Sequence, residues 1–301
     1  MRVEDLTRKA YPDSEIVPRS GGELNTVFEV RRSAGPQLIV KVYAPESTWR
    51  QAKEIHVYGL LAHELGDAIP QVVHAEPPDK TDETDETDAF TVLTKLDGVP
   101  LSETSPPDWR PIYRQLGALL AKIHSIRQPA YGYLTDHIID PLPTNSQYMR
   151  RQFAKKIDEF HGDPELKQHI AQYVDQRAAL LERNVQPVLC HNDFHEGNVL
   201  VDPNTWQVRG FVDVENAIAA DPLMDLAKTD YYSIHDDKAK LDGLLDGYGE
   251  LPPEWRERTT LYRLYHALEL WDWLHSIGTV DPLDSIAGDL RSILGITRNR
   301  H

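Results

Sequence analysis

Two kinds of hydrophobic periodicity divide the chain. In the first third, short apolar runs alternate with polar residues between turn residues, which predicts β-strands. Residues 26–30 and 38–43 flank a Gly-Pro turn and are expected to pair as an antiparallel hairpin. Residues 47–65 carry apolar side chains at helical spacing, so one helix is expected there, with Ser47 as its N-cap.

Two further strands are expected at 71–75 and 90–94. The run of Thr, Asp and Glu between them, at 79–88, lacks the glycine and the ligand order of a calcium loop. We therefore expect a solvated loop in that place. Beyond it, strand-like pairs are expected at 187–190 with 199–201 and at 207–214, and helices at 116–124, 150–160, 164–183 and from 222 onward.

This order of elements predicts an α+β fold in two parts. Residues 1–95 would form a small antiparallel β-sheet with one helix. Residues 96–301 would form a larger, mainly helical lobe.

Composition excludes several classes of protein. The 32 Lys and Arg against 48 Asp and Glu give a net charge of −16, which is poorly suited to gripping nucleic acid or an anionic membrane. No stretch approaches the roughly 18 apolar residues of a membrane helix, and the start of the chain does not resemble a signal peptide. The single Cys190 rules out an intramolecular disulfide. We expect a cytoplasmic monomer or homodimer without nucleic-acid or membrane partners.

The densest chemical signal is a polar loop between apolar runs, from His191 to Asn198. Asp193 in this loop can orient an attacking hydroxyl and accept its proton. Asn198, five positions later, and Asp213, on the next hairpin, can hold the metal ions that bridge phosphates. Phosphoryl transfer needs these residue types because positioning and charge neutralisation supply most of its catalysis.

A second signal lies among the first strands. Lys41 stands in the middle of a predicted strand, where an ammonium group is costly unless it meets a phosphate or a carboxylate. Glu54, on the helix that follows, is the candidate partner. A Lys–Glu pair of this kind is typical of kinase nucleotide sites. The turn at Gly21 and Gly22 would lie over the phosphates, although it does not match G-x-G-x-x-G.

Taken together, these motifs resemble the aminoglycoside phosphotransferase family, a branch of the protein-kinase-like fold. The family's catalytic-loop pattern H-x-D-x-x-x-x-N falls on His191, Asp193 and Asn198, and its second metal-binding aspartate falls on Asp213. The resemblance extends from about residue 15 to residue 230. It implies a bilobal protein-kinase-like fold, in which residues 1–95 are the nucleotide-binding lobe and residues 96–301 are the catalytic and substrate-binding lobe.

Three further segments carry the resemblance. Residues 221–227 match the family's D-P-x-x-D-L-A signature, and residues 116–124 match its L-G-x-x-L-A-x-x-H helix. Residues 91–98 resemble the hinge strand, whose backbone would hold the adenine at Thr94 and Leu96.

The resemblance also implies roles for individual residues. They are Asp193 as catalytic base, Asn198 and Asp213 as Mg²⁺ ligands, Lys41 paired with Glu54 as a nucleotide-phosphate ligand, Asp225 as acceptor for catalytic-loop backbone amides, and His191 as a structural residue of that loop.

Departures from the kinase pattern narrow the class. Asp213 is followed by Val-Glu rather than Phe-Gly, and no A-P-E segment follows, which favours a small-molecule kinase over a protein kinase. Asn192 stands where the family often has glycine.

Asp230, Glu269 and Asp272 are candidates for binding substrate ammonium groups, with a solvated helix face as the alternative.

The leading functional hypothesis is Mg²⁺-dependent transfer of the γ-phosphate of ATP or GTP to a hydroxyl of a cationic small molecule, most simply an aminoglycoside antibiotic. A macrolide, a choline-like amine, a sugar or a peptide antibiotic is the alternative acceptor. A third hypothesis is a nucleotide-binding module without turnover, which the retention of the base and both metal ligands disfavours.

Overall fold

The computed structural model describes residues 7, 11–19, 25–78 and 88–296. It divides into two compact units. Unit 1 comprises Met1–Pro106, Leu134–His137 and Glu196–Asn216, and unit 2 comprises Pro107–Tyr133, Ile138–His195 and Ala217–His301. The predicted lobe boundary after residue 95 stays a prediction. Unit 1 itself extends to Pro106 and includes two later segments of the chain. The turn at Gly21 and Gly22 and nearly all of the acidic run at 79–88 lie outside the described residues.

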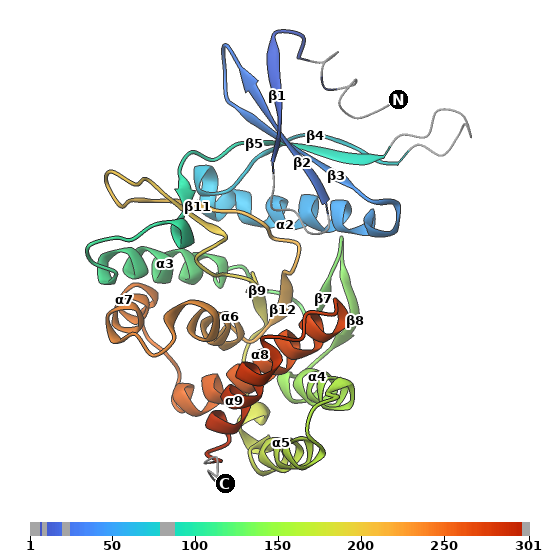
Figure 1. Ribbon diagram of the computed structural model, residues 1–301, viewed down its shortest axis with the longest axis vertical. Helices are drawn as coiled ribbons and strands as arrows, with labels where there is room; N and C mark the ends of the chain where they lie inside the picture. The colour runs from blue at the N-terminus through green and yellow to red at the C-terminus, as the bar shows by residue number, and fades with distance from the viewer. Residues whose placement is uncertain (1–6, 8–10, 20–24, 79–87, 297–301) are drawn as a thin grey trace. The chain divides into compact units, whose positions relative to one another are not determined.

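Unit 1 contains a five-stranded antiparallel sheet in the order β1-β2-β3-β5-β4 (Figure 1). The predicted hairpin is confirmed as β2 and β3, with Val27 opposite Lys41, and the two predicted later strands are β4 and β5. The strands span Ser14–Arg19 (β1), Asn25–Arg32 (β2), Leu38–Tyr43 (β3), Val72–Glu76 (β4) and Ala89–Thr94 (β5).

One face of this sheet forms a hydrophobic core because apolar residues alternate along its central strands. Helix α2 (Trp49–Leu65) buries a second apolar stripe beneath the sheet (Figure 1). The expected N-cap is wrong: Ser47 belongs to a short 3-10 turn, Pro45–Ser47, and its hydroxyl donates to the Ala44 carbonyl at 3.1 Å. The core residues are Phe28, Val30, Leu38, Val40, Phe90 and Val92.

A three-stranded sheet in unit 1 has the order β11-β10-β6. Its strands are β6 (Val99–Pro100), β10 (Val199–Val201) and β11 (Val208–Phe211). Glycine is required at position 210 of β11, where φ is +150° and a Cβ atom would lie 1.9 Å from the Ala68 carbonyl oxygen.

The expected pairing of residues 187–190 with 199–201 is wrong. Strand β9 (Val188–Cys190) pairs with β12 (Ile218–Ala220) in unit 2, whereas β10 pairs with β11. All residues of β9 and β12 are buried, although β9 lies at the edge of its sheet. Strand β10 instead pairs with β11, which follows it after a short turn. In this turn the Asp202 carboxylate accepts the amide of Asn204 at 2.9 Å.

Unit 2 combines a small sheet, in the order β8-β7-β12-β9, with seven α-helices among its described residues. Strands β7 and β8 span Tyr131–Leu134 and Ile138–Leu142. The predicted helices are confirmed, although the one expected at 164–183 ends at Gln176 and continues as a 3-10 turn. The helices are α3 (Arg110–Ile123), α4 (Asn145–Glu159), α5 (Pro164–Gln176), α6 (Leu223–Thr229), α7 (Lys238–Tyr248), α8 (Trp255–Ser276) and α9 (Leu283–Ile293).

Helices α3 and α7 approach each other closely at small residues. A Cβ atom at Gly117 of α3 would lie 2.1 Å from the Leu244 carbonyl oxygen, so no larger residue fits there without displacing α7. This contact gives a packing reason for the glycine of the L-G-x-x-L-A-x-x-H helix. None of the helices among the described residues is long and apolar enough to span a membrane.

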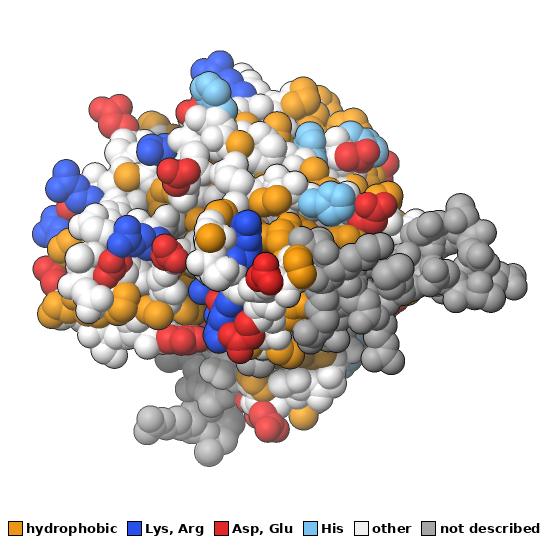
Figure 2. All heavy atoms as spheres, turned by 90° about the horizontal axis from the view of Figure 1, so that it is seen from above, with side chains coloured by type: hydrophobic (Ala, Val, Ile, Leu, Met, Phe, Trp, Pro, Cys, Tyr) orange, Lys and Arg blue, Asp and Glu red, His pale blue; other side chains and the backbone are white. Residues whose placement is uncertain are grey.

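Charged side chains of both signs are interspersed over the face in Figure 2. On the described part of this face, the acidic excess of the chain is therefore not gathered into one patch. Net charge alone does not mark a surface for a cationic ligand there.

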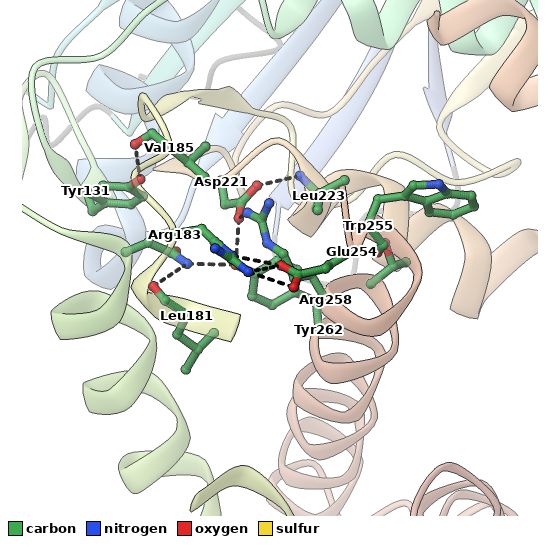
Figure 3. Close-up of polar contacts among 12 residues, drawn as sticks. Tyr131, Leu181, Arg183, Val185, Asp221, Leu223, Glu254, Trp255, Arg258 and Tyr262 are labelled. Atoms are coloured by element: carbon green, nitrogen blue, oxygen red, sulfur yellow. Dashed lines mark hydrogen bonds and ion pairs between the residues drawn. The ribbon is translucent and has the colours of Figure 1, made fainter. Parts of the chain in front are cut away.

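A buried ionic network attaches α8 to the end of β12 (Figure 3). The carboxylate of Asp221, just after β12, pairs with the guanidinium of Arg258 on α8 and accepts a hydrogen bond of 2.7 Å from the Tyr262 hydroxyl. The same carboxylate accepts the backbone amide of Leu223 at 3.0 Å, at the start of α6. Asp221 and Arg258 are both almost fully buried, so each depends on the other for its charge compensation.

The Arg258→Met variant is expected to lower the free energy of unfolding by about 3–5 kcal/mol, because it leaves the Asp221 carboxylate buried without its cation. Urea denaturation measures this change. Arg183→Met is the matched control: it removes an exposed pair with Glu254, also drawn in Figure 3, and should cost less than about 1 kcal/mol. Equal losses in the two variants would contradict the assignment.

Candidate active site

Unit 1 carries a buried ion pair between the sheet and its helix. Lys41 on β3 places Nζ 2.7 Å from Oε1 of Glu54 on α2. Tyr43, two residues along the same strand and on the same face, donates its hydroxyl hydrogen to the other oxygen of Glu54. The structure therefore contains the Lys–Glu pair that the sequence suggested, together with a tyrosine that the sequence analysis missed. The strand period of two could have identified Tyr43.

The charge on Lys41 is held by carboxylates on two elements. Burial alone would lower the pKa of Lys41, but Glu54 and Asp213 outweigh it and hold that pKa well above its ordinary value. Asp213 Oδ1 lies 3.7 Å from Lys41 Nζ. Lys41 is therefore a permanent cation beside two carboxylates, as expected of a phosphate ligand.

The two candidate metal ligands lie at the same end of the β10–β11 hairpin. The Val212 amide donates to the Asn198 carbonyl at 2.9 Å, which aligns Asn198 with the residue that precedes Asp213. Asp213 has a positive φ of 65°, an uncommon conformation for a residue other than glycine. Its Oδ1 atom is buried and accepts no hydrogen bond from the described residues. A carboxylate oxygen in that condition, near an Asn, fits a site for Mg²⁺.

Glu215, two residues after Asp213, forms a further ion pair. Its Oε1 atom lies 2.8 Å from Nη1 of Arg50 on α2. Burial, and then the Asp213 carboxylate, raise the pKa of Glu215 above its ordinary value. This pair ties the segment after β11 to the helix that carries Glu54, and the sequence analysis did not identify it.

The candidate adenine-binding backbone lies at the end of β5. The Thr94 amide donates to the Gln71 carbonyl at 2.9 Å, and the Lys95 amide donates to the Gln37 carbonyl at 2.8 Å. Leu96 follows directly. The adenine contact at Thr94 and Leu96 stays a prediction, as does the phosphate contact at Gly21 and Gly22, which lie outside the described residues.

The catalytic loop begins in unit 2, directly after β9. The side chain of Asp193 is 20% exposed, and its Oδ2 atom lies 3.7 Å from Nε2 of His195. Burial would raise the pKa of Asp193, but His195 and Lys228 outweigh it and hold that pKa well below its ordinary value. The carboxylate is therefore ionised at neutral pH and able to accept a hydrogen bond. The chain passes from unit 2 to unit 1 after His195, so Asn198 belongs to unit 1.

Asp225 holds the start of this loop. Its carboxylate accepts the amides of His191 at 2.7 Å and Asn192 at 2.6 Å, and it lies 3.0 Å from Nε2 of His124. This is the backbone contact that the family resemblance implies for Asp225. His124 ends the L-G-x-x-L-A-x-x-H helix, and the side chain of His191 is buried against the Phe194 ring.

Asn192, which stands where the family often has glycine, suits the backbone conformation at its position. Asn192 has a φ of +57°, a conformation that glycine adopts freely and that asparagine tolerates better than most residues. Asparagine can therefore replace the glycine of the family pattern at little conformational cost.

The three candidate substrate carboxylates each lie beside a basic side chain of unit 2. Glu269 Oε2 lies 2.8 Å from Nδ1 of His266 and 3.7 Å from Nζ of Lys228. The corresponding contacts of the other two are Asp272 with Lys156 at 2.5 Å and Asp230 with Arg263 at 3.2 Å. Their role as substrate ligands stays a prediction.

An antiparallel sheet followed by helical elements, with a Lys–Glu pair in the sheet unit and an H-x-D-x-x-x-x-N loop, defines the protein-kinase-like fold. The phosphotransferase enzyme family matches residues 15–260, and the chain belongs to this family. It is an enzyme of the small-molecule kinase class. The family resemblance and the fold class expected from the sequence are confirmed.

Relatives agree with this assignment. An aminoglycoside 3'-phosphotransferase of Streptomyces fradiae is 26% identical over 240 residues, which cover 75% of this chain and 83% of that protein. A thermostable mutant of aminoglycoside phosphotransferase APH(4)-Ia, solved with ADP and hygromycin B, has a TM-score of 0.72 at 18% identity, with 99% of both chains covered. A putative fructosamine-3-kinase from Thermobifida fusca has a TM-score of 0.68 at 18% identity, with 93% of both chains covered.

Proposed function

We propose that the protein transfers the γ-phosphoryl group of ATP or GTP to a hydroxyl of an aminoglycoside, with Mg²⁺. The arrangement of Lys41, Glu54 and Asp213 in unit 1 carries this proposal, because it joins a permanently charged lysine to a carboxylate whose buried oxygen accepts no hydrogen bond from the described residues. The aminoglycoside 3'-phosphotransferase relative supports the acceptor class. A cytoplasmic location and a monomeric or homodimeric state stay predictions from the sequence.

In this proposal, the residues of unit 1 bind the nucleotide. Lys41, oriented by Glu54 and Tyr43, contacts the phosphates. Asn198 and Asp213 hold the metal. Bound Mg²⁺ would neutralise charge on the phosphate oxygens. The buried Glu54 keeps the lysine in one position, so the phosphates meet a fixed charge.

Asp193 acts on the acceptor. Its carboxylate receives a hydrogen bond from the acceptor hydroxyl and orients the oxygen toward the γ-phosphorus. As the new O–P bond forms and the bond to the β-phosphate oxygen breaks, the hydroxyl proton passes to Asp193. Asp225 fixes the backbone of the loop on which Asp193 stands.

A second candidate acceptor is a hydroxyl compound with few positive charges, such as a sugar or a macrolide. The basic partners of Asp230, Glu269 and Asp272 favour it, because a carboxylate already paired with a cation attracts an ammonium ligand weakly. Because one structural neighbour is a putative fructosamine-3-kinase, sugars are included among the acceptors to be tested.

An acceptor screen separates the two candidates. We expect aminoglycosides to raise the release of ADP or GDP well above the acceptor-free rate, with phosphorylated product confirmed by mass spectrometry. Macrolides, sugars and choline-like amines form the other arms. Turnover with one of these and not with aminoglycosides would overturn the aminoglycoside assignment. Nucleotide binding without product from any acceptor would overturn the proposed function.

A further inference from the structure

One face of α6 holds the catalytic loop at two places. Asp225 binds the amides of His191 and Asn192, and the Thr229 hydroxyl donates to the Phe194 carbonyl at 2.7 Å. These two helix residues are four positions apart and therefore lie on the same side of α6. Asp193 stands between the two attachment points. Lys228, three positions after Asp225, shares this side of the helix.

Lys228 is buried among groups that belong to unit 2. Its Nζ atom lies 3.7 Å from Glu269 Oε2 and 4.9 Å from the ring centroid of Tyr232. The Tyr232 ring stacks on the His195 ring, with centroids 6.2 Å apart and planes inclined by 21°. His195 Nε2 lies 3.7 Å from Asp193 Oδ2. A continuous series of side chains thus connects the Lys228 ammonium to Asp193.

Tyr232 stands in a π-helical turn, Asp230–Ile234, that directly follows α6. Turns of this kind are rare and often occur at functional sites. Here the turn places the Tyr232 ring close to both Lys228 and His195.

We propose that Lys228 is a positioning residue of the phosphotransfer reaction, whose ammonium group keeps the Asp193 carboxylate ionised and oriented for the acceptor hydroxyl. This inference rests on the proposed role of Asp193. In this proposal Glu269 neutralises the charge of Lys228 and does not bind the substrate, because a buried ammonium group needs a counter-charge.

The electrostatics of the cluster agree with this role. Burial would lower the pKa of Lys228, but Tyr232, Glu269, Asp193 and Asp225 raise it, so the lysine stays charged. Around Asp193, the groups that favour its ionised form are His195, then Lys228, then His191.

The test replaces Lys228 by methionine. We expect kcat to fall by about 10- to 100-fold, because one of the charges that support Asp193 is lost. The acid limb of the kcat/KM profile should move to higher pH, because removing a nearby cation raises the pKa of a carboxyl group. Nucleotide binding by calorimetry should be unchanged. Lys228→Arg keeps the charge and should recover part of kcat.

Lys156→Met is the matched control. Lys156 is also largely buried in unit 2, but its ammonium group pairs with Asp272 and Glu159 rather than with the side chains that connect Lys228 to Asp193. This variant should keep the wild-type kcat and pH profile. Lys228→Met combined with Glu269→Gln guards against misfolding, since it removes both charges of the pair. We expect the double variant to fold and to remain as slow as Lys228→Met.

Two results would overturn the inference. One is a Lys228→Met enzyme with kcat within twofold of wild type and an unshifted pH profile. The other is a double variant that is folded and fully active. Either result, obtained with a wild-type enzyme that phosphorylates its acceptor, leaves the proposed function intact. A wild-type enzyme that phosphorylates no acceptor in the screen would instead refute the proposed function.

Discussion

Replacing Asp193 by asparagine is expected to remove nearly all turnover and to leave nucleotide binding unchanged. Asparagine keeps the size of the side chain but cannot accept the proton of the acceptor hydroxyl. The loss of a positioned general base lowers kcat by about 100- to 10,000-fold. Nucleotide affinity should stay within about twofold, since the proposed phosphate contact, Lys41, and its partner Glu54 are unchanged in this variant.

Steady-state kinetics with the acceptor found by the screen, and calorimetry with the nucleotide, measure the two effects separately. Glu159→Gln is the matched control, because it neutralises another partly buried carboxylate of unit 2, one that pairs with Lys156 and has no proposed role in the site. That variant should keep most of its kcat. If Asp193→Asn kept more than a tenth of the wild-type kcat, Asp193 would not be the base.

The part of the site around Asp193 could be predicted from the sequence because its residues are close along the chain. Asp193 and Asn198 lie on one loop, and the fixed spacing of H-x-D-x-x-x-x-N identifies both. Asp225 is found in the same way, and its contacts with the loop backbone follow from the motif. Alternation along β2 and β3 was enough to predict the hairpin that carries Lys41.

Contacts between distant segments could not be predicted. Arg50 and Glu215 are 165 positions apart, and no local pattern links them. Strand β9 was assigned to the wrong partner because short apolar runs do not specify which strand they pair with.

The environment of Glu269 is another example. From the sequence, a glutamate at helical spacing is expected to be solvated or to bind substrate. Only the three-dimensional fold shows that Glu269 lies beside Lys228 and His266. Lys228 itself had a weak local signal, since it lies three positions after Asp225 on the same helix. Which side of that helix faces the loop was visible only from the contacts of Asp225 and Thr229.

Asp213→Asn is expected to weaken metal-dependent nucleotide binding and to reduce kcat by about 100- to 1,000-fold, because it removes a charged ligand from the proposed Mg²⁺ site. Asparagine is the informative replacement at this position. The backbone of Asp213 has a φ of +65°, which asparagine tolerates and most other residues do not, so the variant changes charge with little strain. It also leaves Lys41 with one carboxylate partner fewer.

Calorimetry with the nucleotide over a range of Mg²⁺ concentrations gives a readout that does not depend on turnover. In the wild type, added Mg²⁺ should tighten nucleotide binding, and in Asp213→Asn this effect should largely disappear. Asp202→Asn is the control, since Asp202 belongs to the same hairpin but pairs with Arg209 and caps the turn. Its response to Mg²⁺ should match that of the wild type. An unchanged response in Asp213→Asn would contradict the proposal, because it would show that the charge of the Asp213 carboxylate contributes nothing to metal-dependent nucleotide binding.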